Sequence, residues 1–200
     1  MGTQLTAVVF DAADPAALAG FWAGALGWSE PVPGADGVWT LRGRSGIDLR
    51  FLPADRPKLG KNRVHLDLAG DAAEADRVVG LGASRIDIGQ GDVPWTVLAD
   101  PEGNEFCVLP HVTAVDGALA AICQDATDTP AQAEFWTRLI GWTVTESGEW
   151  GVRMRPADGH GPALVMGPPA APKLGPNRVR LGVSCPEPGV DPEGNEYGPR

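Results

Sequence analysis

The stretch from Arg63 to Leu68, RVHLDL, alternates charged or polar side chains with apolar ones. Successive side chains of a β-strand point to opposite faces, so the apolar residues would share one face and Arg63, His65 and Asp67 the other. Imidazole titrates near neutral pH and is a common metal ligand, and a neighbouring carboxylate can pair with it. This face of the strand is therefore suited to acid–base chemistry or to metal binding, and His65 is the candidate catalytic residue.

Two further apolar runs add candidates by the same alternation. IDLRFL places Asp48 and Arg50 on the face away from its apolar residues, and EFCVL does the same for Glu105 and Cys107. Each has a structural alternative. His65 can be a polar residue hydrogen-bonded to a carboxylate, and Cys107 can be a small buried hydrophobe, which is how free cysteine usually behaves.

Tryptophan is the other chemical signal, with seven in 200 residues. Trp22 and Trp28 lie on or beside an expected helix, where core packing explains them. Trp39 and Trp95 lie on short expected strands. They offer flat faces for an aromatic or cationic ligand, or else they fill the interior of the fold.

Composition limits the classes of partner. The chain has 16 basic and 26 acidic residues, and the basic ones are scattered, so we expect no nucleic-acid partner. It has no apolar run near the roughly 18 residues of a membrane span and no signal-peptide pattern, so we expect a soluble cytoplasmic protein with no membrane partner. Its three cysteines lack Cys-x-x-Cys spacing, which predicts reduced thiols rather than a disulfide framework or a structural zinc site.

Three short sequences each occur twice in the chain, and the distances between the two copies differ. FW and PKLG return after 114 and 115 residues, whereas DPEGNE, at 100–105 and 191–196, returns after 91. Asn62 lies 38 residues before Asp100, but Asn177 lies only 14 before Asp191, so 24 residues are missing from the second copy. By alignment the loss covers the helix and the two strands that follow RVRLGV.

The element pattern agrees with a duplication. Thr6–Phe10 predicts a strand, Asp14-Pro15 begins a helix that Gly27 ends, and two or three strands follow. NRVHLDL starts the series again, with a helix capped by Asp71 and three strands that end in EFCVL. We therefore predict two complete βαβββ modules in a domain of residues 1–110, and one complete module with a truncated one in a domain of residues 111–200.

A strand, a helix with FW before LGW, three strands, HLDL and a closing DPEGNEFCVL together resemble the vicinal oxygen chelate superfamily. This group holds glyoxalase I, bleomycin-resistance proteins and extradiol dioxygenases, and the likeness is strongest to bacterial glyoxalase-like domains in tandem. The resemblance implies an α+β fold in which paired βαβββ modules form a half-open barrel, with helices outside and the ligand in a concave cup.

The resemblance also implies a set of metal positions. Metal-dependent members carry His or Gln on the first strand, a carboxylate on the fourth, His on the fifth and Glu on the eighth. The matching positions here are Ala7, Asp48, His65 and Cys107, of which two agree by type. We therefore predict no cofactor, with a divalent metal on Asp48, His65 and Cys107 as the alternative, since zinc accepts a thiolate. In the second copy these positions hold Ala121, Ala163, Arg180 and Gly198, where we expect no metal.

The resemblance implies a protein of the drug-sequestering kind that binds a small organic molecule, aromatic or cationic, in the cup of residues 1–110. The expected ligand-binding residues are Trp39, Asp48, Arg50, Arg63, His65, Asp67, Trp95, Glu105 and Cys107. One alternative is a metal-dependent lyase, isomerase or dioxygenase resembling glyoxalase I. Another is a metal-free enzyme that uses His65 with Asp67 or Glu105, and the sequence does not decide between binding and catalysis.

The deletion also bears on assembly. A module without a helix and two strands exposes apolar sheet and open strand edges. We therefore expect either a homodimer or a second domain that lies against the first.

Overall fold

The computed structural model describes residues 2–199 and has the expected α+β architecture. The first half of the chain contains β1 (Leu5–Ala12), α1 (Pro15–Leu26), β2 (Val32–Pro33), β3 (Trp39–Leu41), β4 (Asp48–Pro53), β5 (Val64–Ala69), α2 (Ala72–Gly80), β6 (Ser84–Arg85), β7 (Thr96–Ala99) and β8 (Glu105–Leu109). The second half contains β9 (Leu119–Asp125), α3 (Thr129–Ile140), β10 (Thr143–Gly148), β11 (Gly151–Arg155), β12 (Ala163–Gly167), β13 (Val179–Val183), β14 (Gly189–Val190) and β15 (Glu196–Gly198).

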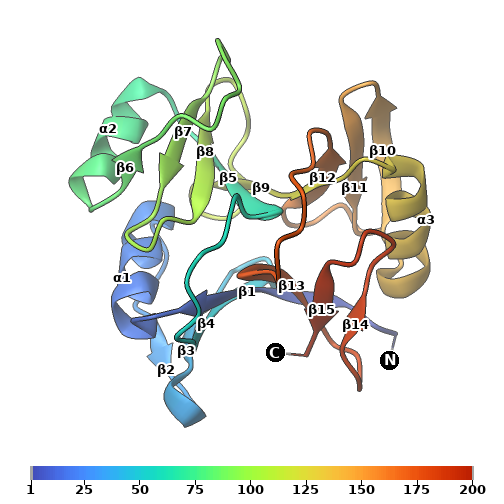
Figure 1. Cartoon of the computed structure of the whole chain (residues 1–200), viewed down its shortest axis with the longest axis horizontal. Helices are drawn as coiled ribbons and strands as arrows, with labels where there is room; N and C mark the ends of the chain where they lie inside the picture. The colour runs from blue at the N-terminus through green and yellow to red at the C-terminus, as the bar shows by residue number, and fades with distance from the viewer. Residues whose placement is uncertain (1, 200) are drawn as a thin grey trace.

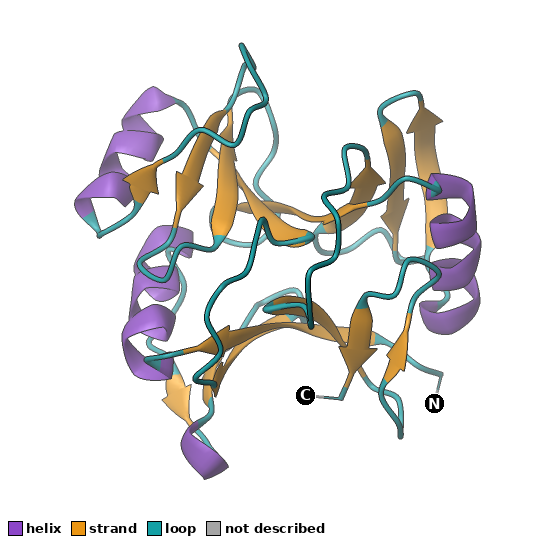
Figure 2. Ribbon diagram, viewed as in Figure 1, coloured by secondary structure: helices purple, strands orange, loops and turns teal. Residues whose placement is uncertain are grey.

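The strands form two curved sheets that remain open (Figures 1 and 2). A seven-stranded sheet has the order β14-β15-β13-β1-β4-β3-β2, and an eight-stranded sheet has the order β10-β11-β12-β9-β5-β8-β7-β6. The β1 strand lies antiparallel to β13, and β5 lies antiparallel to β9. Each sheet therefore combines one module from each half of the chain. The domain boundary near residue 110 stays a prediction, and both sheets cross it.

The helices begin and end where the sequence predicts. The Asp14 side chain accepts a hydrogen bond from Ala17 N at 3.0 Å, Pro15 occupies the first turn of α1, and Gly27 ends the helix with φ 67°. The α3 helix repeats this arrangement with Asp128 as its N-cap. Among residues 2–199, no helix is long and apolar enough to cross a membrane.

A single hydrophobic core joins the two sheets. The Trp22 ring of α1 lies 5.6 Å from Phe10 of the seven-stranded sheet and 5.1 Å from Phe106 of the eight-stranded sheet. In the second half, Trp136 of α3 lies 5.7 Å from Tyr197. The core role predicted for Trp22 is confirmed, because the side chain is buried and contacts both sheets.

The DPEGNE segments form two tight turns, as predicted. In the first turn, Asp100 Oδ1 accepts hydrogen bonds from Glu102 N and Asn104 N at 2.9 Å each, and Gly103 has φ 81°. Glu102 then accepts hydrogen bonds at 2.9 Å from the backbone nitrogens of residues 13 and 14, where α1 begins. The same carboxylate pairs with Arg178 of the second half.

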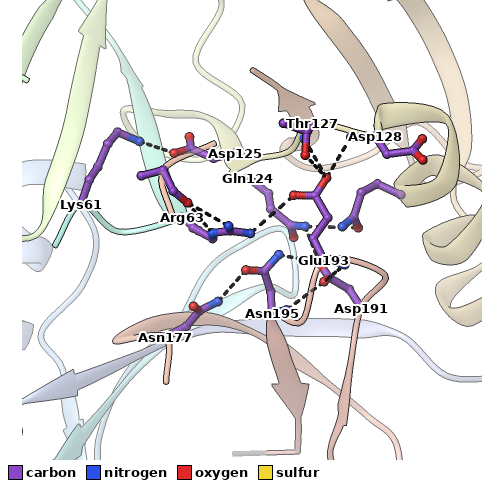
Figure 3. Close-up of polar contacts among 12 residues, drawn as sticks. Lys61, Arg63, Gln124, Asp125, Thr127, Asp128, Asn177, Asp191, Glu193 and Asn195 are labelled. Carbon is purple, nitrogen blue, oxygen red and sulfur yellow. Dashed lines mark hydrogen bonds and ion pairs between the residues drawn. The ribbon is translucent and has the colours of Figure 1, made fainter. Parts of the chain in front are cut away.

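The second turn reproduces these contacts with the halves exchanged (Figure 3). Glu193 accepts hydrogen bonds from Thr127 N at 2.7 Å and Asp128 N at 2.9 Å, where α3 begins. It also pairs with Arg63 of the first half at 3.4 Å. Each DPEGNE turn thus fixes a helix of its own half and binds an arginine of the other half, which gives both copies a structural role.

The arginines end two loops that run side by side between the sheets (Figure 1). These are the PKLG loops, residues 54–63 and 168–178, and they enclose a cavity of about 180 Å³. A Cβ placed on Gly60 would lie 3.3 Å from Leu174 Cδ1, and one placed on Gly175 would lie 3.2 Å from Leu59 Cδ1. The leucine of each loop therefore covers the glycine of the other loop.

The deletion is smaller in structure than predicted. The described chain after β13, residues 184–199, contains no helix, but β14 pairs antiparallel with β15 through Gly189 and Val190. One of the two strands expected to be lost is therefore still present as the two-residue β14, in which Val190 is the register partner of Glu196. The two halves pair within the chain through β1–β13 and β5–β9. The homodimer and the cytoplasmic location stay predictions.

Candidate functional site

The polar side chains of β5 lie on the face of the eight-stranded sheet that is turned away from the core. On β5, Leu66 is buried in the core, whereas the His65 and Asp67 side chains are 17% and 14% exposed. His65 is the register partner of Cys123 on β9, and Asp67 is that of Cys107 on β8. We call the face that carries these four residues the cup face.

Asp67 lies at the centre of the cluster. The Cys123 thiol donates a hydrogen bond to Asp67 Oδ2 at 3.0 Å, and His65 Nε2 lies 3.6 Å from Asp67 Oδ1. The other imidazole nitrogen, His65 Nδ1, is buried, has no hydrogen-bond partner among residues 2–199, and lies 4.0 Å from Asp125 Oδ1. Among residues 2–199, His65, Asp67 and Cys123 form the group whose ligand atoms all lie within 4.8 Å of one another.

Burial sets the charges of this cluster. It lowers the pKa of His65 to about 3, with a further lowering from the Lys61 charge. It raises the pKa of Asp67 to about 6, although hydrogen bonds from the thiols and the charge of Arg153 act in the opposite direction. Burial and the nearby Asp67 charge also raise the pKa values of Cys107 and Cys123. At neutral pH the imidazole is therefore neutral, both thiols are protonated, and Asp67 carries the negative charge.

These pKa values predict how stability depends on pH in the metal-free protein. Below pH 6.5 the unfolded chain protonates His65 while the native state does not, so this residue makes stability fall on acidification toward the native pKa of about 3. Asp67 has the opposite effect between its native pKa of about 6 and its ordinary 3.8, but its shift is smaller. Acidification from neutral pH to about pH 4.5 should therefore lower the unfolding free energy of both proteins by different amounts. The loss in His65→Gln should be about 2–3 kcal/mol smaller than the loss in wild type. Urea denaturation in chelator measures this difference, and identical pH profiles would contradict the assignment.

Three other polar residues near the cup face already have partners. Asp125 accepts a hydrogen bond from Lys61 Nζ at 2.5 Å (Figure 3). Glu105 accepts hydrogen bonds from Lys58 Nζ at 2.5 Å and Asn62 N at 3.1 Å. Arg63 pairs with Glu193 and donates to the backbone oxygen of residue 171 at 2.8 Å. The predicted ligand residues Arg63 and Glu105 thus hold the PKLG loops in place.

Trp95 lies close to the cup face along the sequence. Its Nε1 donates a hydrogen bond to Gln90 at 3.2 Å, and residues 85–88, 90–93 and 95–97 line an open cavity of about 370 Å³. Val97, two residues further along, is the register partner of Cys107. The cavity therefore adjoins the edge of the cup face.

Comparison with known proteins agrees with this fold. A family model described as a glyoxalase-like domain matches residues 7–109 and 121–193. The chain belongs to the glyoxalase-like domain family. This places it in the vicinal oxygen chelate superfamily, as the sequence motifs indicated.

Two solved structures illustrate the likeness of fold. Glyoxalase I from Zea mays superimposes with a TM-score of 0.66 at 10% identity, covering 98% of this chain and 91% of that one. A putative dioxygenase from Bacillus subtilis gives 0.62 at 15% identity, covering 90% of this chain and 69% of that one. At these identities the likeness shows the fold alone. The comparison with curated protein sequences gives no significant match.

The metal positions implied by the family lie in two different sheets of this glyoxalase-like protein. Asp48 is the register partner of Ala7 in the seven-stranded sheet, and it accepts a hydrogen bond from Arg42 Nη1 at 2.6 Å. His65 and Cys107 lie in the eight-stranded sheet. The alternative set Asp48, His65 and Cys107 does not fit a single ion, because β4 pairs with β1 and not with any strand of the cup face.

Two other predicted ligand residues also belong to the seven-stranded sheet. Arg50 donates a hydrogen bond to the backbone oxygen of residue 199 at 3.2 Å. Trp39 is the register partner of Phe51 and packs against the core. It therefore faces the core and not a cup, since Phe51 is fully buried.

Cys123 and Asp125 were not among the predicted site residues, and the glyoxalase-like fold brings both beside His65. Both lie on β9, two and four residues after Ala121, the position that was compared with the metal ligands of the family. The alternation along LAAICQD places Ala121, Cys123 and Asp125 on one face, and this was the available signal. Alternation within this segment does not reveal that β9 pairs with β5.

Proposed function

We propose that this glyoxalase-like protein binds a small organic molecule on the cup face, and that Asp67 receives a positively charged or hydrogen-bond-donating group of the ligand. The proposal rests on the charge and exposure of the Asp67 carboxylate. This carboxylate is ionised at neutral pH and partly exposed, and the imidazole of His65 beside it is neutral. The charge of Arg153 acts on Asp67, but among residues 2–199 no lysine or arginine forms an ion pair with it. By contrast, Asp125 and Glu105 each pair with a lysine.

The residues around Asp67 support a compact apolar body for the ligand. Ala121 is its register partner on β9, and Ala163 continues the same row on β12. Val97 and Val165 occupy the neighbouring positions beside the two thiols. The alanines are small side chains beside the carboxylate, and the valines supply apolar contact, as ligand sites usually do.

Binding is better supported than acid–base catalysis by His65. A general base works best when its pKa lies near the working pH, and burial lowers the pKa of His65 to about 3. Such an imidazole accepts a proton poorly at neutral pH. We therefore propose a binding role for the cup face rather than the metal-free enzyme.

The test compares benzylamine with benzyl alcohol, which have the same ring but differ in charge. A hydrogen bond to a charged group contributes about 1.5–3 kcal/mol, so the amine should bind about tenfold or more tightly in isothermal titration. Asp67→Asn should reduce the amine to the affinity of the alcohol. Asp48→Asn, in the other sheet, is the matched control and should change nothing. Equal binding of both probes to wild type, or an amine preference that survives in Asp67→Asn, would overturn the proposal.

A further inference from the structure

We propose that His65, Asp67 and Cys123 form a binding site for a zinc-type divalent ion. One nitrogen, one oxygen and one sulfur of these side chains lie within 4.8 Å of one another on two adjacent strands. Imidazole and thiolate together suit zinc, whereas magnesium and calcium prefer oxygen ligands. This set shares only His65 with the divided positions that the family implies.

The unpartnered nitrogen of His65 is the second observation. Nδ1 is buried without a hydrogen bond, and Asp125 Oδ1 lies 4.0 Å away, longer than a hydrogen bond. Asp125 is itself held by Lys61. Metal-binding histidines usually donate their second ring nitrogen to a carboxylate. A metal on Nε2 places the imidazole proton on Nδ1, on the side of Asp125.

The site has an accessible side. The His65 and Asp67 side chains are partly exposed on the cup face. Three protein ligands leave one position of a tetrahedral zinc ion for water or for another ligand. In binding, the Cys123 sulfur–hydrogen bond breaks, a sulfur–metal bond forms and the proton passes to solvent, so no oxidant or reductant takes part.

Cobalt(II) reports directly on the sulfur ligand, because a thiolate bound to cobalt absorbs in the near ultraviolet. Titration of the full chain, purified in chelator and then freed of it, should give this absorption with saturation at a single equivalent. Zinc should displace the cobalt and remove the absorption. Cys123→Ala should lose the absorption, whereas Cys107→Ala should keep it, because Cys107 is not one of the three proposed ligands. Both variants replace a buried cysteine with a smaller apolar side chain, and circular dichroism verifies that they fold.

Two results would overturn the site: no thiolate absorption in wild type, or absorption that depends on Cys107 and survives in Cys123→Ala. The organic ligand and the metal share Asp67, so Asp67→Asn should weaken both. Cys123→Ala separates them, because it should remove the metal, whereas the preference for benzylamine over benzyl alcohol depends on the Asp67 carboxylate and should persist. Failure of the metal site would therefore leave the organic-ligand proposal standing, and the reverse also holds.

Discussion

Replacement of Asp100 with alanine should lower the free energy of unfolding by about 3–5 kcal/mol. The carboxylate is 3% exposed and accepts hydrogen bonds from Trp22 Nε1 at 3.1 Å and from the backbone nitrogens of residues 102 and 104 at 2.9 Å. Alanine leaves these donors without a partner inside the protein, and each unsatisfied buried donor costs about 1–3 kcal/mol. Urea denaturation followed by circular dichroism measures the loss.

Asp92→Ala is the matched control for this prediction. Asp92 is exposed, so its replacement should change stability by no more than about 0.5 kcal/mol. Asp100→Asn should fall between the two, because an amide oxygen still accepts hydrogen bonds but the amide nitrogen does not. A loss in Asp100→Ala as small as that in the control would show that the turn does not depend on this carboxylate.

Replacement of Glu193 with alanine should lower the free energy of unfolding by about 2–3 kcal/mol. Its carboxylate accepts hydrogen bonds from Thr127 N and Asp128 N and pairs with Arg63. The variant therefore loses a negative charge at the start of α3 and the link between the two halves. Thermal denaturation measures the total effect, and amide hydrogen exchange in the first turn of α3 shows where it arises.

Two variants bracket this second prediction. Glu193→Gln keeps an acceptor oxygen but loses the charge, so it should retain part of the stability. Glu187→Ala, at an exposed position of the same terminal segment, should be nearly neutral. Unchanged exchange in the first turn of α3 of Glu193→Ala would contradict the capping role.

Local sequence predicted the modules and the face of β5 because both depend on short-range patterns. Val64 and Leu66 pack in the core, so the period of two along a strand fixes the opposite face for His65 and Asp67. The same reasoning was available for Trp39. In Trp39-Thr40-Leu41 the polar residue lies between two apolar ones, which places Trp39 on the face of the buried Leu41.

Strand pairing across the chain was beyond a single-sequence pattern. Alternation assigns a face to Asp48 and to His65, but it does not say that β4 joins β1 while β5 joins β9. Cys123 reaches His65 only through that pairing. One long-range signal was present in the sequence: each half has a PKLG lysine and a DPEGNE glutamate, and these pair as Lys58 with Glu105 and Lys173 with Glu196.

We propose that the ligand site is the cup face of the eight-stranded sheet. Amide chemical-shift mapping with benzylamine on isotope-labelled protein tests it most directly, because it locates binding without a variant. We expect shifts concentrated at residues 65–67, 107 and 121–123, with β1, β4 and β13 unaffected. Shifts concentrated on β1, β4 and β13, or the absence of shifts at saturating benzylamine, would contradict it.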